Sequence, residues 1–337
     1  MRRRQYIGHL PKGPRNFTKP NFNLASKDMV KALINASYEQ QSGKNSNTHR
    51  ARRPAIKQFI TFIKDTTSIK RLNDIEKQHV YRFGEFLKNC VDEELMSPGT
   101  ARDYLSHVNR ALAQARGDEA CVVNATKDLD FNPKPGIATV DKSVSDALHE
   151  KVLAQVSPEV GFVMQLQRAL GIRFREGALF DASRVLKEIR KGLVPMLNLG
   201  TKGGQPRALP EITDEKYQLL LRVEQFQKLV GHDSLIPPEQ SFKAFQSEAW
   251  RQTKQADENY LSHGERKHWV CETYFQEMGV RCPVQAGVAH GKAHYKYIAN
   301  ELDISEAEAK KRDHAVRLMI SKLLGHHRVN ITNAYLG

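Results

Sequence analysis

The sequence predicts a mainly α-helical protein of two domains that contains one small β-hairpin. Apolar residues recur at three- and four-residue spacing over most of the chain, which is the pattern of helices with one buried face. The sequence NPKPG at residues 132–136 interrupts this pattern and marks a linker between the domains. Short apolar runs flank a Thr-Lys-Gly-Gly turn at residues 201–204, which is typical of a hairpin.

The composition favours a folded protein that binds a polyanion. The chain has 337 residues, 40% of them hydrophobic and 27% charged, which is enough for two domains with a core. The formal net charge is +14. Nucleic acid is the expected partner rather than a membrane, because no apolar run approaches the length needed to cross a bilayer. The four cysteines show neither metal-site spacing nor disulfide density, and no apolar signal segment follows the basic start, so we expect a cytoplasmic protein.

Residues 1–22 are expected to form a flexible basic arm. The first 20 residues carry six lysines and arginines and no acidic residue, and their prolines forbid a regular helix. Two interpretations stay open, namely an arm that contacts DNA phosphates and a solvated tail.

Residues 23–116 are expected to form a compact domain of four helices. Their apolar stripes are Met29, Val30 and Leu33; Ile56, Phe59, Ile60 and Ile63; Val80, Phe83 and Leu87; and Ala101, Tyr104, Leu105, Val108 and Leu112. Ser26, the pair Asn73 and Glu76, and Ser97 are the expected helix caps. Arg50, Arg53, Arg102 and Arg110 are candidates for phosphate contacts, with a solvated helix face as the alternative.

A linker is expected at residues 117–143, where the helical stripe disappears, and a second domain at residues 144–337. An apolar helix from Val160 to Leu170 leads into Gly-Ile-Arg-Phe-Arg-Glu at residues 171–176. The Arg173 guanidinium can offer two donors to the oxygens of a phosphodiester, with Glu176 holding it in place. A purely structural Arg-Glu pair is the alternative.

Two further candidates lie on turns. Lys202 sits in the expected hairpin, where a solvated turn lysine is the alternative. Near the end of the chain, Gly325 suits the position that ends a helix, so that His326 lies where two elements converge, and Tyr335 follows a short turn later. A helix stop followed by an aromatic anchor is the simpler explanation. Residues 239–277 predict mixed helices without decisive chemistry.

These motifs, in this order and behind a basic helical domain, resemble those of the tyrosine recombinases, the integrases of phages and mobile elements. The resemblance implies a helical core-binding domain followed by an α+β catalytic domain. It implies that Tyr335 attacks a phosphodiester to form a 3′-phosphotyrosine, that Lys202 protonates the leaving 5′ oxygen, and that Arg173, His290 and His326 hold the phosphate. It implies double-stranded DNA attachment sites as partners, a homotetramer on DNA, accessory DNA-bending proteins, and no metal or other cofactor.

One motif departs from the family. The family carries His-x-x-Arg ahead of the Leu-Gly-His motif, and here His290 stands at the expected stage with Ala293 in the arginine position. His314-Ala-Val-Arg317 matches literally but lies too close to Leu324, so we interpret Arg317 as a surface or structural residue. Loss of one preorganised donor typically costs about a hundredfold or more in rate. Catalysis is therefore expected to be impaired unless Lys292 or another base substitutes.

Two alternatives to an active integrase remain at this point. The first is a DNA-binding protein of recombinase descent that is catalytically inactive because of Ala293. The second is a metal-dependent nuclease, since His290 and His294 have the four-residue spacing of zinc ligands on a helix. That pattern lacks the glutamate of His-Glu-x-x-His and an evident third ligand.

Overall fold

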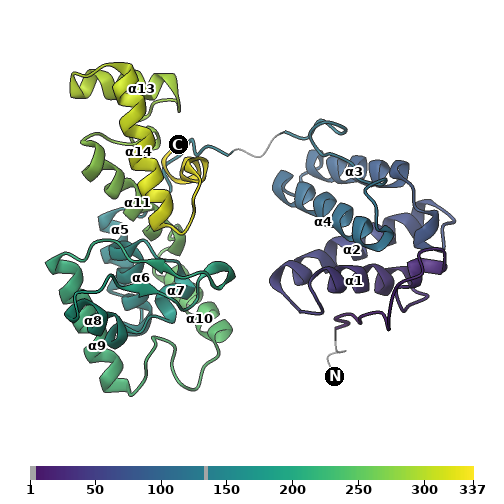
Figure 1. Cartoon of the computed structure of the whole chain (residues 1–337), viewed down its shortest axis with the longest axis horizontal. Coiled ribbons are helices and arrows are strands. Elements are labelled where there is room, and N and C mark those ends of the chain that lie inside the picture. Colours follow the sequence, from purple (N-terminus) through teal and green to yellow (C-terminus); the bar gives the residue numbers. More distant parts are fainter. Residues whose placement is uncertain (1–4, 133–135) are drawn as a thin grey trace. The chain divides into compact units, whose positions relative to one another are not determined.

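The computed structural model describes residues 5–132 and 136–337, apart from the side chain of Lys202. The chain divides into two compact units, Met1–Lys134 and Pro135–Gly337, which we describe separately (Figure 1). The expected mainly helical fold with one small antiparallel sheet is confirmed. None of the helices in the described ranges has the length and apolar character required to span a membrane.

The first unit is a bundle of four helices. They are α1 (Met29–Gln40), α2 (Asn47–Thr66), α3 (Lys77–Asp92) and α4 (Pro98–Arg116), with the short 3-10 turns η1 (Pro20–Asn23) and η2 (Leu72–Asp74). Its core is built from the expected apolar stripes, and Phe59 meets Phe83 edge to face. Ser97 caps α4 as expected, whereas Asp28 rather than Ser26 caps α1, and Glu76 with His79 caps α3.

The first unit extends further along the chain than residue 116. Cys121, Val123, Leu129 and Phe131 are buried in the same core, and the side chain of Asn109 holds Val123 through two backbone hydrogen bonds of 2.7 and 3.2 Å. The structure therefore differs from the expected linker of residues 117–143 over its first half. The apolar residues there have no regular period, so they could not be read as a helix, but they still fill the bundle. Residues 133–135 lie outside the described residues.

The described part of the expected flexible arm is also packed on this bundle. Arg15 donates to the carbonyls of Gln114 and Ala115 at 2.6 and 2.7 Å and pairs with Glu39 at 3.3 Å. The Tyr6 hydroxyl donates to Asn35 at 2.8 Å. Residues 5–22 are therefore held by specific bonds, contrary to the expectation of flexibility. The arginines at positions 2–4 lie outside the described residues.

The second unit contains eleven labelled helices and the hairpin within its described residues. The helices are α5 (Asp146–Leu153), α6 (Pro158–Leu170), α7 (Phe174–Ala178), α8 (Ala182–Arg190), α9 (Asp214–Val230), α10 (Phe242–Ala256), α11 (Ser262–Met278), α12 (Pro283–Ala286), α13 (Lys292–Leu302), α14 (Glu306–Leu323) and α15 (Asn333–Leu336). Strands β1 (Met196–Leu197) and β2 (Arg207–Ala208) pair antiparallel, with Leu197 opposite Arg207.

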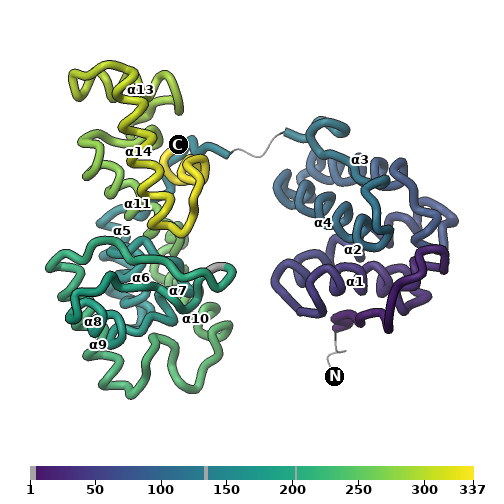
Figure 2. The backbone as a smooth tube through the Cα atoms, viewed as in Figure 1, coloured from purple at the N-terminus to yellow at the C-terminus, as the bar shows by residue number. Residues whose placement is uncertain are grey.

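The end of the chain returns to the middle of this second unit. The 3-10 turn η4 (Val329–Thr332) contacts α14, and α15 contacts α11 (Figure 2). Leu336 is fully buried and packs in a core cluster with Trp269 and Ile320. The burial of this leucine fixes the short helix that carries Tyr335 against α11.

Candidate active site

A buried carboxylate, that of Glu176, organises the site. Gly171 ends α6 in a left-handed conformation (φ +62°), and the chain then turns into α7 with Arg173 at its N-cap. Glu176, three residues on, accepts from the backbone N–H of Arg173 at 2.6 Å and from its guanidinium at 2.8 Å. The Glu176 side chain has no exposed surface, so its charge must be balanced by neighbouring cations.

Arg207, at the start of β2, supplies the second cation. Its two terminal nitrogens donate to the two oxygens of Glu176 at 3.0 and 2.8 Å, and its Nε donates to the carbonyl of Leu323 at 3.0 Å. Burial lowers the pKa of Arg207 to about 10, although Glu176 opposes this change. The guanidinium therefore stays charged at neutral pH.

Arg266, in the second turn of α11, supplies the third cation. It is completely buried and donates to the carbonyl of Gly171 and to that of Leu324, the latter at 3.0 Å. Its Nη1 lies 3.9 Å from Glu176. Three guanidinium groups thus surround one carboxylate, which leaves an excess of positive charge suited to a phosphodiester.

Tyr335 lies beside this cluster. It is half-buried in α15, and Lys267 of α11 donates to the carbonyl of the preceding Ala334 at 3.4 Å. The phenol is close enough to Arg266 and to Arg207 to oppose the lowering of their pKa values by burial. Tyr335 therefore lies next to arginines that could bind a phosphate.

Two histidines flank the phenol and the arginines. The ring of His263 lies 5.7 Å from the ring of Tyr335, and Nε2 of His326 lies 3.5 Å from a terminal nitrogen of Arg173. Desolvation, followed by the positive charges of Arg266, Lys267 and Arg173, lowers the pKa of His263 to about 4. His263 is therefore neutral at neutral pH and can accept a proton.

The Leu-Gly-His motif shapes the site through its backbone. The carbonyls of Leu323 and Leu324, at the negative end of α14, accept from Arg207 and Arg266. Gly325 has φ +79°, and a Cβ there would stand 3.0 Å from Cδ of Arg207. Glycine is therefore favoured at this position, because it adopts the positive φ and leaves room for the side chain of Arg207.

The structure brings Arg173, Glu176, His326 and Tyr335 together. Lys202 begins the 3-10 turn η3 (Lys202–Gly204) between the two strands, as the hairpin expectation required. Its side chain lies outside the described residues, so its role stays a prediction.

His290 and Ala293 belong to another environment. His290 Nδ1 lies 2.9 Å from the carbonyl of Gly337, and burial, followed by the charge of Arg317, lowers its pKa, whereas Asp313 opposes this change. The interpretation of Ala293 as the departed catalytic position stays a prediction. The structure offers an alternative, because Arg266 places a guanidinium near Tyr335, with α12 and α13 lying between it and the Leu-Gly-His motif in the chain. Arg317 is structural, since it is buried and donates to Asp313 at 2.9 Å.

One sequence motif was overlooked. It is His-Gly-Glu-Arg at residues 263–266, a literal match to His-x-x-Arg. It lies in the region that we interpreted as lacking decisive chemistry, and a search of that region for His-x-x-Arg would have found it. No sequence signal pointed to Arg207, because an arginine at the end of a hairpin is ordinary until its burial against Glu176 is known.

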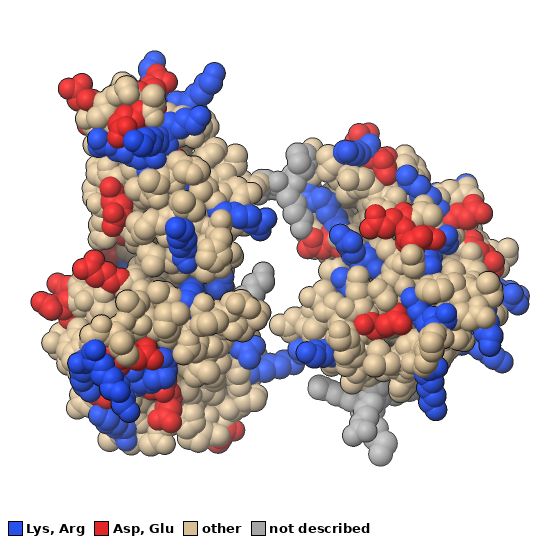
Figure 3. Space-filling view, viewed as in Figure 1, with Lys and Arg blue, Asp and Glu red and all other residues tan. Residues whose placement is uncertain are grey.

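The four candidate DNA-contacting arginines differ in their burial and in their partners. Arg53 is buried and donates to the carbonyl of Tyr6 at 3.1 Å, so it is structural, contrary to expectation. Arg102 donates to the carbonyl of Asn132. Arg50 and Arg110 are exposed, with Arg110 3.9 Å from Glu119. Figure 3 shows lysine and arginine side chains on the visible face of each unit.

A zinc site at His290 and His294 has no support in the geometry. Across the described ranges, no three His, Cys, Asp or Glu residues are arranged to hold a metal ion. His294 is fully buried, with Nε2 3.4 Å from the carbonyl of Arg281 and Nδ1 3.7 Å from Asp313. Its surroundings are those of a structural histidine.

Comparisons with known proteins bear on the fold. The family model of the phage integrase SAM-like domain matches residues 29–130. A lambda integrase dimer bound to a COC′ core site is 14% identical and aligns over 83% of this chain and 76% of that one, with a TM-score of 0.50. The Tn1549 transposon integrase in complex with a circular intermediate DNA is 13% identical, over 93% and 96% of the two chains, again with a TM-score of 0.50. A search among curated proteins found no match.

Proposed function

We propose that the chain is a tyrosine recombinase, a site-specific DNA recombinase that cuts and rejoins DNA through Tyr335; the family model over residues 29–130 and the fold shared with two integrases support this. The observation that carries the proposal is the position of Tyr335, which lies beside His263 and next to a cluster of three arginines around Glu176. A cluster of this kind stabilises the negative charge that develops on a phosphorane.

The proposed reaction is a transesterification in two steps. The Tyr335 oxygen attacks the scissile phosphorus and releases its proton to a neutral histidine, for which His263 is the nearest candidate. The bond to the 5′ oxygen breaks, Lys202 gives that oxygen a proton, and a 3′-phosphotyrosine remains. A 5′ hydroxyl of a second strand then reverses the step. No bond energy is lost, so no nucleotide cofactor is required.

Arg173, Arg207 and Arg266 have different parts in this proposal. Arg173 is the least buried of the three, with a quarter of its side chain exposed, and faces His326. It is therefore the best placed to contact a phosphate directly. Arg207 is held on both sides by Glu176 and Leu323, so we assign it a positioning role.

The test is covalent trapping on DNA. Nicked duplexes with a randomised central segment are incubated with the protein, and adducts are recovered under denaturing conditions and sequenced. We expect an adduct that is insensitive to a chelator and absent in Tyr335→Phe. The matched control is Tyr81→Phe, an exposed tyrosine on α3, which should form the adduct as the parent does.

An adduct that persists in Tyr335→Phe would refute the assignment of the nucleophile. DNA binding without any adduct in the parent would favour the inactive DNA-binding alternative. That alternative rests on the arginine missing at Ala293, whereas the position of Arg266 near Tyr335 supports an active enzyme. Further proposals by resemblance are a tetramer on double-stranded attachment sites and accessory DNA-bending proteins.

A further inference from the structure

A cavity beside the candidate active site is not used by the proposed reaction. It has a volume of about 190 Å³ and lies between α6, α10 and the start of α11. His263 belongs both to this cavity and to the surroundings of Tyr335. Phe174, which also lines it, follows Arg173 directly in the chain. A group bound in the cavity would therefore be a near neighbour of a phosphate bound at the arginines.

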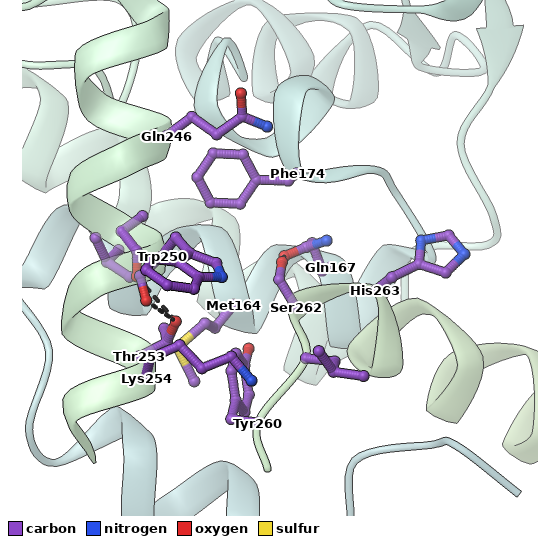
Figure 4. A pocket seen from close by; sticks show the side chains of 13 residues that line it. Met164, Gln167, Phe174, Gln246, Trp250, Thr253, Lys254, Tyr260, Ser262 and His263 are labelled. Atoms are coloured by element: carbon purple, nitrogen blue, oxygen red, sulfur yellow. Dashed lines mark hydrogen bonds between the residues drawn. The ribbon is translucent and has the colours of Figure 1, made fainter. Parts of the chain in front are cut away.

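The cavity is lined by aromatic rings on one side and by amides and hydroxyls on the other. Figure 4 shows Trp250 and Phe174 near each other, with Gln167, Ser262 and Tyr260 beside and below them and His263 at the far edge. This is the composition of a site for a flat, partly polar ring, which stacks on an aromatic face and forms hydrogen bonds at its edge.

Trp250 is the most unusual residue of this group. Its side chain is 64% exposed, whereas the other tryptophan of the chain, Trp269, is 6% exposed and packs in the core. An indole that is 64% exposed contributes little to the hydrophobic core, and at the edge of the cavity its ring face stays free to stack on a planar ligand. Behind it, Phe174 stacks on Phe245 with ring centres 5.8 Å apart and planes inclined by 28°, so the aromatic wall is rigid.

One polar group of the cavity lining lacks a hydrogen-bond partner. The hydroxyl of Tyr260 is buried without a hydrogen bond of normal geometry among the described residues, and burial, followed by the charge of Glu265, raises its pKa. Arg175 lies over the ring of Phe242 at 5.0 Å and adds positive charge next to the aromatic wall. The ligand should therefore be planar, able to form hydrogen bonds, and attached to an anion.

We propose that this cavity binds one nucleobase that leaves the DNA stack next to the scissile phosphate, with Trp250 as its stacking partner. The proposal rests on the proposed function, since it takes the phosphate to lie at Arg173 and Tyr335. Unstacking a base costs free energy, and an aromatic platform offsets this cost for any base because every base has a π face.

The experiment compares two anionic chains that differ in their bases alone. One is a decathymidylate, and the other is a chain of ten abasic tetrahydrofuran nucleotides with the same phosphates. Binding to each is measured by anisotropy of an end label, and the tryptophan emission is recorded in parallel. We use the Tyr335→Phe protein, so that covalent chemistry does not enter the measurement.

We expect the decathymidylate to bind about tenfold more tightly than the abasic chain, as is typical of one stacked base, and to quench the emission of Trp250. In Trp250→Ala this ratio should fall to about one and the quenching should disappear. The control is Leu229→Ala on α9, which removes an apolar side chain that is 84% exposed and should keep the tenfold ratio. Because Trp250 is exposed, its replacement leaves the core intact.

Equal binding of the two chains by the parent would overturn the proposal, as would an equal loss for both in Trp250→Ala. In the latter case Trp250 would serve general DNA contact or a protein partner. The trapping assay separates this failure from that of the proposed function, since an adduct at Tyr335 can form whether or not a base enters the cavity.

Discussion

Arg207 and Glu176 form a buried, bidentate ion pair in which each terminal nitrogen of the guanidinium donates to one oxygen of the carboxylate, at 3.0 and 2.8 Å. The same carboxylate holds Arg173. One buried carboxylate therefore holds both Arg173, which would contact the DNA, and Arg207, which would support the site. This arrangement makes Glu176 a positioning residue whose loss should affect both stability and chemistry.

We expect Glu176→Gln to lower the free energy of unfolding by about 3 kcal/mol, because it leaves buried guanidinium groups without their countercharge. Urea unfolding followed by circular dichroism measures this change. The control is Glu308→Gln, which breaks an exposed i,i+4 pair with Arg312 and should leave the free energy of unfolding nearly unchanged. Equal losses in the two variants would contradict the central position of Glu176.

Arg266→Lys should slow adduct formation about a hundredfold or more, since lysine cannot reproduce the fork that reaches Gly171 and Leu324 beside Tyr335. Ala293→Arg should change the rate less than about twofold, whereas the sequence analysis expected Ala293 to impair catalysis. Single-turnover trapping measures both rates, and thermal unfolding reports whether each variant is folded. A gain of activity in Ala293→Arg would support the interpretation that Ala293 stands in the position of the family's second arginine.

Gly325→Ala should reduce adduct formation more than Gly279→Ala does. Both glycines have φ +79°, so both substitutions carry the cost of about 1–2 kcal/mol of a left-handed alanine. The added methyl group meets Cδ of Arg207 at 3.0 Å in the first case but meets Leu302 at an ordinary 3.6 Å in the second. The trapping rates are compared under conditions in which the two variants are equally stable, so that a difference in rate reports the displacement of Arg207. Identical rates would show that the contact is harmless.

His294 should make stability depend on pH. Burial lowers its pKa from 6.5 to about 4, an effect that Asp313 opposes and Arg317 and His290 reinforce. Below pH 6.5 the unfolded chain binds this proton more readily than the folded one, so stability is complete above pH 6.5 and falls as the pH approaches 4. The loss is roughly 3 kcal/mol for this group.

The measurement is urea unfolding of the parent and of His294→Gln between pH 4 and 8. Burial also lowers the pKa of His263 and His290, so the parent loses stability in the same direction from several groups. The difference between the two proteins isolates His294. A pH profile of the same slope in both would exclude the buried histidine as a cause.

Much of the fold follows from short-range patterns. The helices of the first unit, their caps and the hairpin depend on residues a few positions apart, which a sequence displays directly. The same holds for Arg173 and Glu176, whose three-residue spacing across a helix start makes their contact a local event. Gly325 is readable too, because the end of a helix requires a positive φ.

The linker and the motif His263-Gly-Glu-Arg266 could not be obtained in this way. Leu129 and Phe131 have no period, so their burial depends on the bundle that they meet; Leu129, for example, lies against Gly84 and Lys88 of α3. His263 and Arg266 were present in the sequence, but His290 stood nearer to the Leu-Gly-His motif along the chain. Distance along the chain is a poor guide where residues far apart in sequence are in contact, as Arg266 and Leu324 are.

The sequence by itself determined a basic, mainly helical protein with a hairpin, a helix-breaking glycine before His326, and Tyr335 near the end of the chain. The tertiary structure alone decided which arginines share the charge of Glu176 and which histidine meets Tyr335. The physical reason is that charge burial depends on desolvation and on partners from distant segments, and neither is encoded in the spacing of residues along a chain.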